Sequence, residues 1–148
     1  MTTWQSSSLK ETSEIAKEIL TDLRKEKNSK KAVILGLVGE LGAGKTAFTK
    51  ALAKELKIKD RVSSPTFVLM RRYETKDKDF KRLYHFDCYR MESASELKKI
   101  NWEEISKDSQ ALVVLEWADL VKKVLPKDTI WLKFSHGGKD KERKIVRK

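Results

Sequence analysis

A glycine-rich stretch between residues 39 and 46 carries the clearest chemical signal in the chain. It fits the phosphate-loop pattern G-x-x-x-x-G-K-S/T with the residues Gly39, Glu40, Leu41, Gly42, Ala43, Gly44, Lys45 and Thr46. The apolar residues 33–38 precede it and predict a strand, and Phe48, Leu52 and Leu56, spaced four apart, follow it and predict a helix. Strand, glycine loop and helix in this order form the context in which the pattern binds phosphate.

The chemistry of this loop is that of polyphosphate binding. Its glycines let the backbone turn several N–H groups toward one concavity, and the positive end of the following helix points into that concavity. Lys45 adds a mobile positive charge for the outer phosphates, and the Thr46 hydroxyl can ligate Mg²⁺. The sequence therefore predicts that residues 40–46 bind a nucleoside triphosphate. The alternative is a glycine-rich turn that matches the pattern by chance.

A carboxylate at the end of a second buried strand is the expected partner for the metal. The apolar residues 111–115 are followed directly by Glu116 and Trp117. Because the carboxyl ends of parallel strands meet at one edge of a sheet, Glu116 is predicted to lie beside the phosphate loop. There it would hold Mg²⁺ or align an attacking water. The alternative is a strand-terminal acid that points to solvent, and Trp117 either packs in the core or covers the site.

The loop at residues 63–67 follows the predicted phosphate-loop helix, where switch-type segments lie in related folds. Pro65 fixes the chain direction, and Ser64 or Thr66 can offer a hydroxyl to the γ-phosphate or its magnesium. A plain proline turn into a strand explains the same residues equally well.

Residues 85–90 end another strand-like segment. In a strand His85, Asp87 and Tyr89 share one face, so an imidazole and a carboxylate lie together. Asp87 is a candidate for orienting water and Arg90 for neutralising phosphate charge. A structural His–Asp or Asp–Arg pairing is the competing interpretation.

The remaining pattern predicts one α/β domain over residues 1–148. The strand at 33–38 is apolar on both faces, which implies layers above and below it. Capping boxes begin a helix at Ser8 with Glu11 and another at Ser93 with Glu96. The other predicted elements are a short edge strand at 4–7, an antiparallel pair at 67–73 and 80–86 around a tip at 76–79, a helical segment closed by Pro126, and a hairpin at 129–134 and 143–146.

Composition narrows the class of protein further. No apolar run approaches the ~20 residues that a membrane helix needs, and the N-terminus lacks a charged-then-apolar signal pattern. The lone Cys88 excludes an internal disulfide and suits a reducing cytoplasm. The formal net charge of +11 indicates either a solvated lysine-rich surface, as at 76–79 where lysines alternate with acids, or an acidic partner, for which residues 139–148 form the densest basic run.

With these segments in hand, the chain resembles the TsaE (formerly YjeE) family of small P-loop ATPases of tRNA threonylcarbamoyladenosine biosynthesis. The phosphate loop alone is shared with many enzymes, but the other three segments are specific. In order along the chain, the matching segments are the phosphate loop, residues 64–67, residues 85–90 and residues 115–117.

The resemblance implies a three-layer α/β/α P-loop NTPase fold with a mixed, mostly parallel central sheet, and ATP with Mg²⁺ at its phosphate-loop edge. It implies that Lys45 and Thr46 serve the phosphates and the metal, and that Glu116 completes the metal site. Asp87 corresponds to an acid important for ATP turnover in the family. The further nucleotide contacts that it implies are Thr12, Thr66, Trp117 and Arg143.

The family also implies partners. Its members work with a heterodimer of TsaB and TsaD, which transfers the threonylcarbamoyl group onto adenosine 37 of tRNA, so tRNA is met only through the complex. The ATPase acts on that complex and does not perform the transfer.

Other classes stay open on the residues alone. A small-molecule or nucleoside kinase shares the P-loop, although the segment after Trp117 is short and carries lysines where kinase lids carry arginines. A GTPase is disfavoured because no D-x-x-G follows a strand and no N-K-x-D is present. A nucleotide-gated RNA-binding module would rest on the basic balance.

Overall fold

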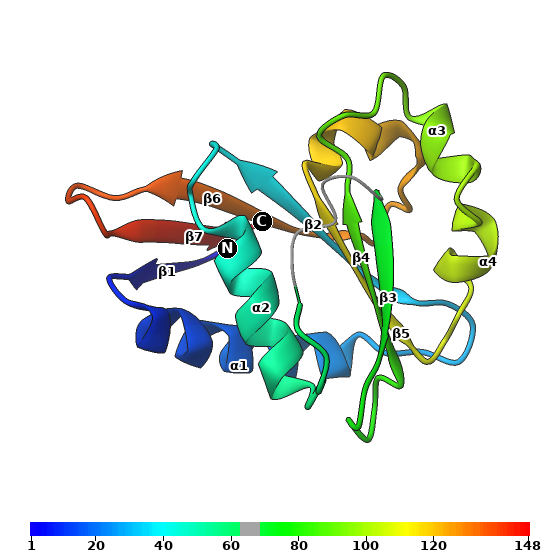
Figure 1. Cartoon of the computed structure of the whole chain (residues 1–148), viewed down its shortest axis with the longest axis horizontal. Helices are drawn as coiled ribbons and strands as arrows, with labels where there is room; N and C mark the ends of the chain where they lie inside the picture. The colour runs from blue at the N-terminus through cyan, green and yellow to red at the C-terminus, as the bar shows by residue number, and fades with distance from the viewer. Residues whose placement is uncertain (63–68) are drawn as a thin grey trace.

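The computed structural model describes residues 1–62 and 69–148, and these form a seven-stranded sheet with helices on both faces (Figure 1). The predicted loop at 63–67, with Thr66, lies outside the described residues. The elements in chain order are β1 (Thr2–Ser6), α1 (Leu9–Lys25), β2 (Val33–Gly39), α2 (Lys45–Glu55), β3 (Met70–Glu74), β4 (Arg82–Asp87), α3 (Ser95–Lys98), α4 (Trp102–Ser106), β5 (Ala111–Glu116), the 3₁₀-helical segment η1 (Ala118–Val124), β6 (Ile130–His136) and β7 (Arg143–Arg147).

The sheet is mixed, as predicted. Its strand order is β1-β7-β6-β2-β5-β4-β3. The central strands β6, β2, β5 and β4 run parallel, whereas β1, β7 and β3 pair antiparallel at the two flanks. The parallel centre brings the carboxyl ends of β2, β4 and β5 to one edge, which is where ligands bind in open α/β sheets.

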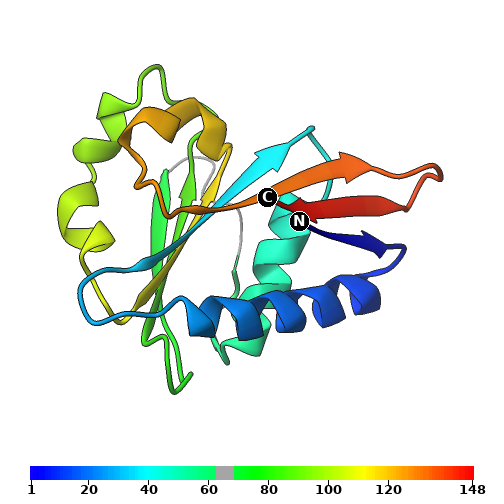
Figure 2. The same cartoon turned by 180° about the vertical axis from the view of Figure 1, so that it is seen from behind.

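Helices lie on both faces of the sheet and make three layers (Figure 2). Two separate apolar clusters fill the two faces of the sheet. Alternate residues of β2 supply both clusters: Val33 and Leu35 pack with α1 and α2, and Ile34 packs with α3, α4 and η1. This confirms the prediction that the strand at 33–38 is covered on both sides. None of the described helices is both long enough and apolar enough to span a bilayer.

Helix α1 begins where the sequence predicts. The Ser8 hydroxyl accepts a hydrogen bond from the Glu11 N–H at 3.1 Å, and the Glu11 carboxylate accepts one from the Ser7 N–H at 3.3 Å. The second box is only half formed, because the Glu96 carboxylate accepts from the Ser93 N–H at 3.1 Å while the Ser93 hydroxyl contacts Ser95 instead. Helix α4 was not predicted.

The tip of the β3–β4 hairpin corrects one interpretation of the charge pattern. The alternating charges at 76–79 predict a solvated surface, yet the Asp77 side chain is only 5% exposed. Arg24 of α1 donates to both of its oxygens, at 2.6 and 2.7 Å, and to Asp79 at 2.8 Å. The prediction is wrong for Asp77 because its partner lies 53 residues earlier in the chain.

Burial alone would raise the pKa of the Asp77 carboxyl, but the hydrogen bonds from Arg24 and from the N–H groups of Phe80 and Asp79 outweigh it. The pKa falls to about 2. A carboxyl with a lowered folded-state pKa stabilises the fold above its ordinary pKa, and that contribution is lost as the pH falls toward 2.

We expect Asp77→Ala to lower the free energy of unfolding at pH 7 by about 2–3 kcal/mol, from the lost ion pair and backbone hydrogen bonds. Urea unfolding at pH 7, 5 and 3 measures it, and the deficit should shrink as the pH falls below 4. The neighbouring Lys78→Ala, at an exposed position, should change stability by less than about 0.5 kcal/mol at every pH. A deficit for Asp77→Ala that does not depend on pH would contradict the electrostatic explanation.

Candidate functional site

The phosphate loop leaves β2 through a residue that must be glycine. Gly39 has φ 137°, and a Cβ atom there would lie 2.0 Å from the carbonyl oxygen of Phe134 on the neighbouring strand β6. At the other end of the loop Gly44 has φ 99° and caps α2. Both positions demand the left-handed region that glycine adopts without strain, and together they bring the loop backbone around the N-terminus of α2.

Lys45 is held by its own loop. The side chain is buried, and Nζ donates hydrogen bonds to the carbonyl oxygens of Gly39 at 2.7 Å and Glu40 at 2.8 Å. Nζ also lies 4.3 Å from the centre of the Trp117 ring. Burial lowers the pKa of the Lys45 ammonium, although nearby carboxylates, Glu116 first among them, oppose this.

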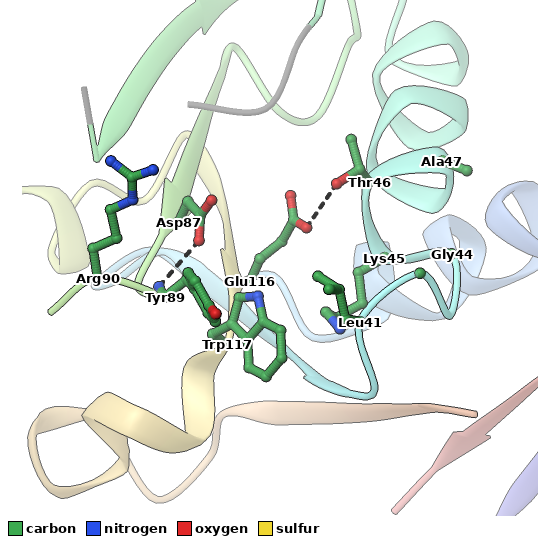
Figure 3. Close-up of a pocket in the computed structure, with 11 residues that line it drawn as sticks. Leu41, Gly44, Lys45, Thr46, Ala47, Asp87, Tyr89, Arg90, Glu116 and Trp117 are labelled. Carbon is green, nitrogen blue, oxygen red and sulfur yellow. Dashed lines mark hydrogen bonds between the residues drawn. The ribbon is translucent and has the colours of Figure 1, made fainter. Parts of the chain in front are cut away.

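Glu116 is the carboxylate that faces the loop. It is the last residue of β5, its side chain is 5% exposed, and its Oε1 accepts a hydrogen bond from the Thr46 hydroxyl at 2.9 Å (Figure 3). Its other oxygen, Oε2, lies 2.5 Å from Nε2 of the fully buried His85. The structure thus brings together the strand-terminal acid and the first turn of α2, as the sequence predicts. It adds the imidazole of His85, for which the sequence predicts only a pairing with Asp87.

Asp87 ends the adjacent strand β4, and the register pairs it directly with Glu116. Its Oδ1 accepts a hydrogen bond from the N–H of Tyr89 at 3.1 Å, which fixes the turn that leaves the strand. In Figure 3 the side chain of Glu116 lies between those of Asp87 and Thr46. The acids predicted separately from two segments are therefore neighbours across a parallel strand pair.

A cavity of about 390 Å³ unites these groups. Arg90, a candidate for neutralising phosphate charge, is among its lining residues, whereas Ala47 and Tyr89 line it without having been predicted to act there. Tyr89 packs on Trp117 with ring centres 5.0 Å apart, so Trp117 both lines the cavity and packs against a second aromatic ring. The complete lining is Leu41, Gly42, Gly44, Lys45, Thr46, Ala47, Asp87, Tyr89, Arg90, Glu116 and Trp117.

A second cavity, of about 330 Å³, borders the same loop. It contains Thr12 and Arg143 and shares Gly42, Gly44 and Ala47 with the first cavity. The Thr12 hydroxyl lies 2.7 Å from that of Ser6, and Arg143 packs on Gly44, where a Cβ atom would meet its side chain at 3.7 Å. The two residues that rested on resemblance alone thus line one cavity beside the loop.

The other loop residues have different surroundings. Ala43 is buried beneath the turn, and its N–H donates to the carbonyl oxygen of Glu40 at 3.2 Å. The Glu40 side chain is exposed and lies 3.7 Å from His136 of β6.

The oxygen pair of Thr46 and Glu116 fits a hard cation. Nowhere in residues 1–62 and 69–148 do three His, Cys, Asp or Glu side chains gather into a group that could hold a metal. Mg²⁺ needs no such cage, since proteins usually give it one or two oxygen ligands and leave the rest to phosphates and water. A hydroxyl and a carboxylate oxygen 2.9 Å apart beside a phosphate loop meet this requirement.

Comparison with known proteins shows the family to which the chain belongs. The family model "Threonylcarbamoyl adenosine biosynthesis protein TsaE" matches residues 6–145. The tRNA threonylcarbamoyladenosine biosynthesis protein TsaE of Bacillus subtilis (strain 168) is 39% identical over 113 residues, which cover 76% of this chain and 67% of the relative. The protein of the same name from Aquifex aeolicus is 40% identical over 95 residues, covering 58% and 69%.

A solved structure supports the fold as well. The crystal structure of Bacillus subtilis YdiB superposes with a TM-score of 0.69 at 31% identity, over 99% of this chain and 83% of that one. Since the family model spans nearly the whole chain, the assignment does not depend on the phosphate loop alone. The chain belongs to the TsaE family of threonylcarbamoyl adenosine biosynthesis proteins.

Proposed function

We propose that this protein binds ATP with Mg²⁺ at the phosphate-loop cavity, hydrolyses it, and thereby acts on a TsaB–TsaD complex that installs threonylcarbamoyl on adenosine 37 of tRNA. The observation that carries the chemical part is the Thr46–Glu116 contact of 2.9 Å next to the buried Lys45. The part that concerns tRNA modification rests on family membership.

The loop supplies the phosphate site. Backbone N–H groups at the start of α2 and the helix dipole favour negative charge in the cavity. The hydrogen bonds of Lys45 to the carbonyls of Gly39 and Glu40 hold its ammonium group beside the loop in one side-chain conformation. A preorganised charge of this kind stabilises the charge that spreads over the γ-phosphate as its bond to the leaving group breaks.

Thr46 and Glu116 would hold the metal, which when bound neutralises phosphate charge and aligns the γ-phosphate with its nucleophile. Both oxygens of Glu116 are already engaged, by Thr46 and by His85. We therefore assign the orientation of the attacking water to Asp87, which lines the same cavity beside Glu116.

The second cavity is the proposed place of the base and ribose. Gly42 and Gly44 line both cavities, so a nucleotide could pass over the loop with its phosphates in the first cavity and its base and ribose in the second. Thr12 and Arg143 would contact that part, and Trp117 with Thr66 would border the phosphates. Binding would also fix the turn after Asp87, where Tyr89 is exposed, and so change the surface offered to the partner.

We expect Lys45→Ala to weaken ATP binding by about 10- to 100-fold, since it removes a charge-assisted contact. Glu116→Ala should keep much of the affinity and lose turnover. Calorimetric titration with ATP and a phosphate-release assay measure the two effects. Lys50→Ala, at an exposed position of the same helix, is the matched control and should leave both unchanged. Unaltered affinity of Lys45→Ala would argue against the phosphate site.

The proposed partner gives a second prediction. Addition of purified TsaB–TsaD should raise the rate of ATP hydrolysis severalfold, and ATP should alter the stability of the three-protein complex, because the Asp87–Tyr89 turn borders the cavity. Phosphate release and analytical size exclusion measure these changes. If neither the hydrolysis rate nor the stability of the complex changes, the proposed action on TsaB–TsaD is wrong. If ATP instead yields a phosphorylated small molecule in a substrate screen, the protein is a kinase.

A further inference from the structure

The function proposed so far assigns no role of its own to the side chain of His85. This side chain nevertheless contacts Glu116, the proposed metal ligand. It is fully buried on β4, and its Nε2 lies 2.5 Å from Oε2 of Glu116. The two residues are 31 positions apart and belong to adjacent parallel strands. Burying polar groups is destabilising unless they are hydrogen-bonded. This short contact therefore stabilises both buried side chains in the site.

The direction of this hydrogen bond follows from its partner. A carboxylate oxygen only accepts, so Nε2 carries the proton and donates it to Glu116. Nδ1 has no hydrogen-bond partner among the described residues. Within that part of the chain, the ring therefore directs its hydrogen bonding to Glu116 alone and is otherwise held by packing.

Glu116 is consequently held at both oxygens. Thr46 donates to Oε1 from α2, and His85 donates to Oε2 from β4. The two donors lie on different elements, so they fix the rotation of the carboxylate plane as well as its position. We infer that His85 is the positioning residue for Glu116: its Nε2–H holds Oε2, so that Oε1 stays turned toward Thr46 and the place of the metal.

This inference rests on the proposed function and deepens it. Groups that hydrogen-bond to a metal ligand orient it, and their loss typically lowers metal affinity or activity by 10- to 100-fold. Without His85 the buried carboxylate would keep one of its two donors and be able to rotate away from Thr46. Loss of His85 should therefore reduce the gain in nucleotide affinity that the metal provides. It should leave nucleotide affinity in the absence of metal unchanged.

Three substitutions separate the hydrogen bond from the shape of the side chain. His85→Phe keeps a planar ring but has no donor. His85→Gln carries its amide about as far from the backbone as Nε2, whereas the amide of His85→Asn reaches only to about the place of Nδ1. Phe86→Leu is the matched control, because Phe86 is equally buried on the same strand but packs in the cluster on the opposite face of the sheet.

The measurement is calorimetric titration with a non-hydrolysable ATP analogue, once with MgCl₂ and once with EDTA. The ratio of the two affinities gives the gain due to the metal. We expect His85→Phe and His85→Asn to lower this gain about 10-fold or more, with the affinity in EDTA within about 2-fold of the unsubstituted protein. His85→Gln should restore most of the gain, and Phe86→Leu should keep all of it.

The outcomes distinguish the two proposals. An unsubstituted protein that does not bind the analogue contradicts the proposed function itself. If it binds with a metal-dependent gain that His85→Phe and His85→Asn retain, only the positioning role is wrong. A His85→Gln protein as defective as His85→Phe, or failure of all three variants to fold in thermal unfolding, would assign His85 a packing role and overturn the inference.

Discussion

The carboxylate of Glu116 is the group on which the architecture of the site depends. A buried charge is destabilising unless polar partners compensate for its lost hydration. Here the partners come from two other elements, the first turn of α2 and the strand β4. The site therefore exists only while β4, β5 and the phosphate-loop helix keep their relative positions. The parallel register that pairs Asp87 with Glu116 fixes the position of β4 relative to β5. A slip of one residue would turn either acid to the other face of the sheet.

A second constraint lies at the start of the loop. The backbone of β6 approaches Gly39 so closely that any side chain would clash with the Phe134 carbonyl. This close approach fixes the start of the loop against β6, which lies on one side of β2. Glu116 is fixed on the other side of β2, by a hydrogen bond from His85 of β4. The loop also uses the Lys45 side chain as an internal brace through two carbonyls. Loop and acid are thus supported from opposite sides of one central strand, which is why the cavity opens at its carboxyl end.

Much of this could be predicted because the signals are local. The stripe of Ile15, Ile19 and Leu23 on α1 and the apolar runs of β2 and β5 depend on patterns within one segment, and all of these residues are buried except Val38, which is half-buried. The phosphate loop and the acid that ends β5 could be predicted from the same kind of local pattern. Helix α4 escaped it because its N-cap, Asn101, has a positive φ of 56° and makes no side-chain capping bond.

What could not be predicted is mostly contact between distant segments. Asp77 sits among lysines in sequence, but its partner Arg24 is reached only after the hairpin folds over α1. His85 shares a strand face with Asp87, which favours a pairing between these two residues. Its hydrogen bond instead goes to Glu116 on the adjacent strand β5. Strand order decides such contacts, and periodicity within a segment carries no information about which strand lies next to which.

The acids at the cavity also bear on which form of the nucleotide the site would take. Asp87 and Glu116 lie side by side at the edge of the sheet, where the phosphates of a bound nucleotide would face them. Like charges in a partly buried site repel strongly, because little water is present to screen them. Lys45 and the helix N-terminus offset part of this repulsion, but both acids remain. Under the proposed function a metal ion between acid and phosphate turns that repulsion into attraction, so the acid pair itself would favour the magnesium complex over the free nucleotide.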